Sequence, residues 1–81
     1  MNDTKLLECF HRSLGIPLER ATDDLAYNSI REWDSVGHMA LVAEIEGAFD
    51  VMFDTDDIVG MSTLGKAREI LTKYGVAFDA A

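Results

Sequence analysis

Several residue types that mark other classes of protein are scarce in this sequence of 81 residues. Seven Lys and Arg stand against 15 Asp and Glu, which gives a formal net charge of -8. A chain that neutralises phosphates needs a basic patch, so neither nucleic acid nor an anionic membrane surface is an expected partner. No apolar run approaches the roughly 20 residues that a transmembrane helix needs. The chain is therefore expected to fold in water.

Cysteine is almost absent as well. Cys9 is the single cysteine, so the chain cannot form an internal disulfide. The N-terminus shows neither a basic region before a long apolar stretch nor a small-residue cleavage site, which a secretory signal would have. We therefore expect a cytoplasmic protein.

Length and composition indicate one domain. The chain has about half the length of a typical domain. Its hydrophobic residues (48%) and charged residues (27%) are in the range of globular proteins. We expect a single domain over residues 1–81, in which about 77–81 form a frayed tail.

Apolar residues at helical spacing, with capping signals, predict four helices. They cover residues 4–14, Asp34-Ser35 to about Asp50, Asp56–Gly60, and the segment after Ser62-Thr63 up to Gly75. Residues 15–34 are predicted to form a long loop with a turn of helix near Asp23–Tyr27. No segment alternates with the two-residue period of a strand. The prediction is an all-α fold with three long helices, one short helix and a long loop after the first.

The second helix has two apolar faces when its residues are placed about 100° apart around the axis. The first face is the expected buried stripe, formed by Leu41, Val42, Ile45, Ala48, Phe49 and Met52. The second patch consists of Val36, Met39 and Ala43, with Glu46 and Asp50 farther along the same side. An exposed apolar surface with a charged rim is typical of a docking site. The alternative is a central helix buried on two sides.

Two further features of this region bear on docking. Gly37 and Gly47 each cost the helix roughly 1 kcal/mol relative to alanine, and close approach by another surface is one reason for them. Between Trp33 and Gly65 there are seven acids and no Lys or Arg. This stretch predicts a negative field that steers basic partners, with simple solvation of the surface as the alternative.

The motif Trp33-Asp34-Ser35-Val36-Gly37-His38-Met39 opens the second helix. It resembles the attachment site of acyl carrier proteins, whose Asp-Ser-Leu motif begins the second helix of a small acidic four-helix bundle. The resemblance covers nearly the whole chain, including the long loop and a Glu-x-x-Phe sequence at Glu46–Phe49. An isolated Asp-Ser would be explained as a helix cap, and the surrounding pattern makes the combination specific.

The resemblance implies a function. Ser35 would carry 4′-phosphopantetheine, transferred from coenzyme A by a separate phosphopantetheinyl transferase, with Asp34 beside it. The thiol of this arm would bind acyl, aminoacyl or hydroxyacyl cargo as a thioester. The chain itself would be a monomeric carrier without enzymatic activity. Its other partners would be an acyl- or aminoacyl-loading ligase and downstream biosynthetic enzymes, which dock on Val36, Met39, Ala43, Glu46 and Asp50.

The chain departs from the family pattern at the same helix. Many fatty-acid carriers have acids at the positions that match Gly37, Ala40 and Gly47, and Val36 replaces the leucine of the motif. The recognition face is therefore less charged and more apolar. Trp33 and His38 resemble the motif of stand-alone carriers in specialised biosynthetic pathways.

Other classes fit the residues less well. Asp34, Ser35 and His38 supply the groups of a hydrolase triad, but without a Gly-x-Ser-x-Gly elbow. We expect His38 to be a structural polar residue, with the lining of a cargo cavity as a second role. Neither the acids from Asp50 to Asp57 nor the pair Cys9 and His11 has the spacing of a metal site. A further alternative is an acidic helical interaction module without a prosthetic group.

Overall fold

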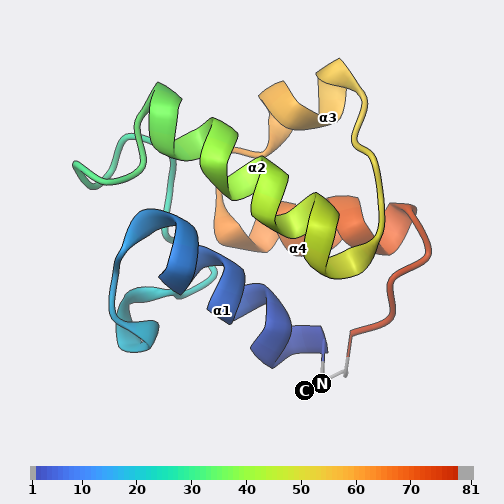
Figure 1. Cartoon of the computed structure of the whole chain (residues 1–81), viewed down its shortest axis with the longest axis horizontal. Coiled ribbons are helices and arrows are strands. Elements are labelled where there is room, and N and C mark those ends of the chain that lie inside the picture. Colours follow the sequence, from blue (N-terminus) through green and yellow to red (C-terminus); the bar gives the residue numbers. More distant parts are fainter. Residues whose placement is uncertain (1, 79–81) are drawn as a thin grey trace.

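The computed structural model describes residues 2–78 and contains four α-helices. They are α1 (Asn2–Leu14), α2 (Ser35–Phe49), α3 (Thr55–Gly60) and α4 (Leu64–Lys73), with a short 3-10 turn η1 (Leu18–Arg20) after α1 (Figure 1). Within residues 2–78 there is no strand, only an isolated bridge between Ala26 and Thr63. The predicted all-α class and the four predicted helices are confirmed, with ends that differ by up to two residues.

Short polar side chains define where three of the helices begin. The side chains of Asp34, Asp54 and Thr63 accept hydrogen bonds from the backbone N–H groups of Gly37, Asp57 and Lys66, respectively. Each such cap satisfies a donor that has no partner inside its own helix and contributes about 0.5–2 kcal/mol. Each capping side chain bonds to an N–H group only three residues away, which is why the sequence alone predicted these helix starts.

The core is built from α1, α2, α4 and the long loop, and Ile58 of α3 packs against its edge. α1 and α2 lie side by side (Figure 1). The largest fully buried side chain is that of Trp33, which belongs to the loop just before α2. Its ring meets the ring of Phe10 edge-on, with centroids 5.2 Å apart. The indole therefore joins the start of α2 to the centre of α1.

The long loop is packed and hydrogen-bonded along its length. Backbone N–H groups of Tyr27 and Leu64 donate to the carbonyls of Ser62 and Leu25, at 2.8 and 3.0 Å. These bonds attach the loop to the connection between α3 and α4. The turn of helix predicted near Asp23–Tyr27 is wrong. The chain makes its helical turn earlier, at η1, and residues 23–27 instead pair with the start of α4.

The C-terminal end of α2 differs from the prediction in one residue. Met52, placed in the buried stripe, is 83% exposed. The helix ends at Phe49, and Asp50 adopts a left-handed conformation with φ of 55°, so the periodicity of the helix no longer applies beyond it. Phe49 itself is half-buried at the edge of the core.

The residues near the C-terminus make specific contacts. The carbonyl of Ala77 accepts a hydrogen bond from Asn2 Nδ2 at 2.6 Å, and the rings of Phe78 and Phe49 lie 6.2 Å apart. These two residues, expected in a frayed tail, are therefore attached to both α1 and α2. The rest of the predicted tail, 79–81, lies outside the described residues. Across residues 2–78, no helix has both the length and the apolar character that crossing a membrane requires.

Candidate functional site

Ser35 is the first residue of α2 and is exposed. The Asp34 carboxylate accepts from the N–H of Gly37 at 2.8 Å, and the Asp34 carbonyl accepts from the N–H of His38 at 2.7 Å. The structure thus brings the two predicted cofactor residues together at a capped helix start. The first N–H groups of a helix and the positive end of its dipole favour an anion at this position.

Gly37 allows the chain to fold tightly against this helix start. A Cβ atom at Gly37 would lie 2.2 Å from the carbonyl oxygen of Glu32 and 3.2 Å from Leu14 Cδ2. The close approach that the sequence suggested is therefore made by the chain's own loop. Gly47 differs, because nothing lies within 4 Å of a Cβ placed there. A residue with a side chain at position 37 would not fit this backbone.

His38 links the start of α2 to α3. Its Nδ1 accepts from the indole N–H of Trp33 at 2.9 Å, and its Nε2 lies 2.8 Å from the carbonyl oxygen of Ile58. An indole N–H can only donate, so Nδ1 is the unprotonated nitrogen and Nε2–H donates to Ile58. The ring is thereby fixed as one neutral tautomer. This agrees with the structural role expected for His38.

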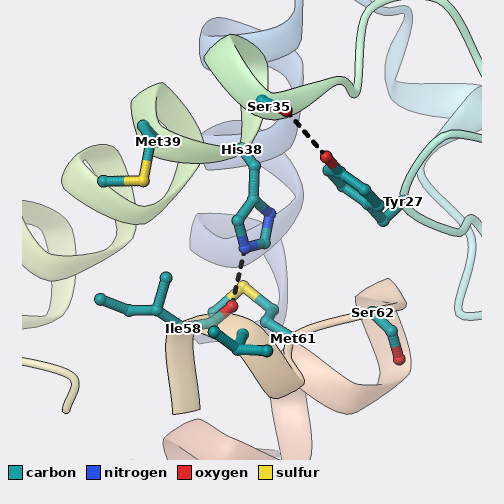
Figure 2. Close-up of a pocket in the computed structure, with 8 residues that line it drawn as sticks. Tyr27, Ser35, His38, Met39, Ile58, Met61 and Ser62 are labelled. Atoms are coloured by element: carbon teal, nitrogen blue, oxygen red, sulfur yellow. Dashed lines mark hydrogen bonds between the residues drawn. The ribbon is translucent and has the colours of Figure 1, made fainter. Parts of the chain in front are cut away.

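A pocket of about 360 Å³ opens beside Ser35. Figure 2 shows its walls, which come from the loop, the first turns of α2, α3 and the residues that follow α3. The lining residues are Tyr27, Ser35, His38, Met39, Ile58, Val59, Met61 and Ser62. Both nitrogens of His38 are hydrogen-bonded within the protein and are not available to a ligand. The wall that His38 shares with Met39, Ile58 and Met61 is therefore mostly apolar. Polar hydroxyl groups come from Tyr27, Ser35 and Ser62.

The hydroxyl groups of Tyr27 and Ser35 point toward each other across one side of this pocket (Figure 2). Their oxygen atoms are 3.1 Å apart. The sequence placed Tyr27 only at the end of a predicted turn in the long loop. Nothing in its local pattern signals the contact, because Tyr27 lies eight positions before Ser35 in an irregular part of the chain.

Asp34, Ser35 and His38 do not form a hydrolase triad. The Ser35 hydroxyl is bonded to Tyr27, the nitrogens of His38 to Trp33 and Ile58, and the Asp34 carboxylate to the backbone of Gly37. A triad requires a hydrogen bond from the serine to the imidazole and another from the imidazole to the acid.

The second apolar patch of α2 is on the surface. Val36 is 78% exposed and Met39 58% exposed, and Ala43 is exposed as well. Burial of α2 on two sides is therefore wrong. Val59 of α3, which is 77% exposed, also lines the pocket with Met39. Whether partner proteins bind this patch stays a prediction.

The two acidic residues at the edge of the patch have different environments. Asp50 is exposed at the end of α2. Glu46 is half-buried, and its Oε2 accepts a hydrogen bond from the backbone N–H of Phe53 at 2.9 Å. Glu46 therefore stabilises the connection between α2 and α3, a role that its position on the helix wheel did not indicate.

Bases from other helices neutralise part of the acidic stretch. Arg12 lies 3.5 Å from a carboxylate oxygen of Glu44. The Asp57 carboxylate accepts from Lys73 and from the Tyr74 hydroxyl, both at 2.6 Å, and these bonds lower the pKa of Asp57. The negative field predicted from local sequence is weakened accordingly, since the compensating bases are distant in sequence.

Cys9 is buried in α1, with 1% of its surface exposed. Its burial, followed by the nearby charge of Glu44, raises the pKa of the thiol to about 11. Among residues 2–78, no three His, Cys, Asp or Glu side chains are grouped closely enough to hold a metal ion.

Comparison with models of known protein families gives no match, and comparison with curated proteins finds no significant sequence similarity.

Proposed function

We propose that this chain is a carrier protein that bears 4′-phosphopantetheine on Ser35, within the four-helix bundle typical of acyl carrier proteins. One observation supports the proposal most strongly. The Ser35 hydroxyl is exposed at the capped start of α2 and lies at an apolar pocket of about 360 Å³. A serine that served only to cap or to solvate the helix would not require such a pocket.

Two features of the site fit this prosthetic group. The start of α2 favours a phosphate attached to Ser35, through its free N–H groups and the helix dipole. The adjoining pocket offers Met39, Ile58 and Met61 as apolar surface for an attached chain. When bound, the group supplies a thiol that forms thioesters with cargo. Ser35 is the point of attachment, and the residues of the pocket orient the group.

Attachment requires chemistry that the chain does not supply alone. The Ser35 oxygen forms a bond to the β-phosphorus of coenzyme A, and the bond from that phosphorus to the 3′,5′-ADP leaving group breaks. The hydroxyl proton passes to a base of the transferase, because His38 is bonded elsewhere. A separate phosphopantetheinyl transferase is therefore part of the proposal.

The remaining partners are proposed from the exposed surface. Val36, Met39 and Ala43 form an apolar strip on the same helix as Ser35, where a transferase or loading ligase has to approach. Docking there would rely on apolar contact more than on charge, because residues 40 and 47 are uncharged. The proposal includes a monomeric, cytoplasmic carrier that is loaded by a dedicated ligase in a specialised pathway.

The test is intact-mass analysis after incubation with coenzyme A and a broad-specificity phosphopantetheinyl transferase. Wild-type protein should gain the mass of one phosphopantetheine, and Ser35→Ala should gain none while remaining helical. Ser62→Ala is the matched control, because Ser62 also lines the pocket and should not be modified. Unmodified wild type, under conditions that convert a known carrier completely, would favour an interaction module without a prosthetic group.

A further inference from the structure

The Tyr27 side chain is held in place on several sides. Its backbone N–H donates to the Ser62 carbonyl at 2.8 Å. Its ring meets those of His38 and Trp33 edge-on, with centroids 5.4 and 6.4 Å apart. The phenol is therefore oriented by the fold before any ligand arrives, and its hydroxyl is directed at Ser35 (Figure 2).

The side chains of Asp34 and His38, which flank Ser35 in the sequence, already have partners. The Asp34 carboxylate accepts from Gly37, and both nitrogens of His38 are bonded, to Trp33 and Ile58. Within residues 2–78, Tyr27 is the residue whose side chain hydrogen-bonds to Ser35. It is 37% exposed, so a group attached to Ser35 can reach its hydroxyl from solvent.

We propose that the Tyr27 hydroxyl donates a hydrogen bond to the phosphodiester formed on Ser35, which fixes the root of the attached arm at the mouth of the pocket. This inference rests on the proposed function. The Ser35 oxygen becomes an ester oxygen of the phosphate, so the charged phosphate oxygens lie next to the atom that Tyr27 already contacts at 3.1 Å.

The change from hydroxyl to phosphodiester strengthens this contact. A hydroxyl donor can approach a phosphate without charge repulsion, whereas a carboxylate at the same place would repel the phosphate. Hydrogen bonds to an ionised acceptor are roughly twice as strong as those between neutral groups. The Tyr27 hydroxyl therefore stabilises the modified (holo) form more than the unmodified (apo) form.

The experiment compares apo and holo forms of wild type and Tyr27→Phe. Phenylalanine keeps the ring contacts and removes only the hydroxyl. Modification should raise the Tm more in wild type than in Tyr27→Phe. The two Tm differences between holo and apo forms should differ by about 4–8 °C for a domain of this size. The ³¹P NMR signal of the phosphodiester should also shift between wild type and Tyr27→Phe, because its hydrogen-bond donor is lost.

Tyr74→Phe is the matched control. The Tyr74 hydroxyl bonds to Asp57 and to the backbone of Asp54, and Tyr74 does not line the pocket. Its loss should lower the Tm of both forms equally and leave the ³¹P signal unchanged.

The outcomes separate this inference from the proposed function. If wild type takes up phosphopantetheine and Tyr27→Phe gives the same ³¹P signal and the same Tm difference, the role of Tyr27 is wrong and the carrier function stands. If wild type takes up no phosphopantetheine, both proposals are overturned.

Discussion

The first turn of α2 packs closely against the loop that precedes it, whereas its last turn is held by the bond from Phe53 to Glu46 and by the contact of Phe49 with Phe78. At the start, Asp34 caps the helix, Gly37 fits against Glu32, and His38 is bonded to Trp33 and Ile58. At the end, the chain turns at Asp50 in a left-handed conformation, and a Cβ at Gly47 would meet nothing. The end that packs closely against its loop is the one that carries Ser35, so close packing and the proposed attachment point coincide.

The largest difference between the two ends should come from their aromatic residues. Trp33→Ala should lower the free energy of unfolding by about 3–5 kcal/mol, because a fully buried ring and its bond to His38 are lost. Phe49→Ala should cost about 1–2 kcal/mol, since this ring is only half-buried. Urea denaturation measures both. Equal costs would show that the end of α2 is as well packed as its start.

The glycines provide the next comparison. Gly37→Ala should destabilise the domain by about 1–3 kcal/mol, because the new methyl group collides with the Glu32 carbonyl. Gly47→Ala should stabilise it by roughly 1 kcal/mol, because alanine is the better helix former and the space is open. Thermal melting followed by circular dichroism gives both signs. A stabilising Gly37→Ala would disprove the tight fit at the start of α2.

Substitutions of the residues that flank α2 should change the free energy of unfolding by smaller amounts. Asp34→Ala should cost about 1 kcal/mol through loss of the cap on Gly37. Asp50→Gly should gain about 0.5–1 kcal/mol, because glycine adopts a positive φ without strain and an acid is removed from the negative end of the helix dipole. Chemical denaturation of both variants tests this. A loss of stability in Asp50→Gly would mean that Asp50 has a structural partner.

The last comparison concerns Asp57, which anchors α3 to the end of α4. Its bonds from Lys73 and Tyr74 lower its pKa below the unfolded value of about 3.9. The stabilisation is therefore complete above that value and is lost as pH falls through the folded pKa.

Asp57→Asn supplies the comparison for this prediction. Melting temperatures measured from pH 7 down to about pH 2 should converge for wild type and variant as the carboxylate is protonated. A constant difference between the two over this range would show that the charge of Asp57 contributes nothing.

Local rules were sufficient for the starts of the helices. Asp34, Asp54 and Thr63 cap helices within three residues of themselves, so the sequence alone indicates these starts. Ser35 and Asp34 were predicted from their motif together with the acidity, the helix order and the Glu46–Phe49 sequence of the chain, and attachment at Ser35 stays a prediction. The exposed patch of Val36 and Met39 followed from helical periodicity.

The rest of the site depends on contacts between distant segments. Tyr27 reaches Ser35 because the loop bonds to Ser62, and no periodicity describes that pairing. The α3 wall of the pocket, with Ile58 and Val59, depends on how a six-residue helix sits against α2. Glu46 was assigned to the surface because a helix wheel does not include the returning chain at Phe53.

The burial of Cys9 has a consequence for cargo retention. With a thiol pKa near 11, only about one molecule in ten thousand carries the reactive thiolate at pH 7. Cys9 is also inaccessible from solvent within α1. A thioester on the arm of Ser35 would thus be protected from exchange with the chain's own sulfur. Thiol-directed reagents should label the arm of the native holo protein without prior replacement of the cysteine.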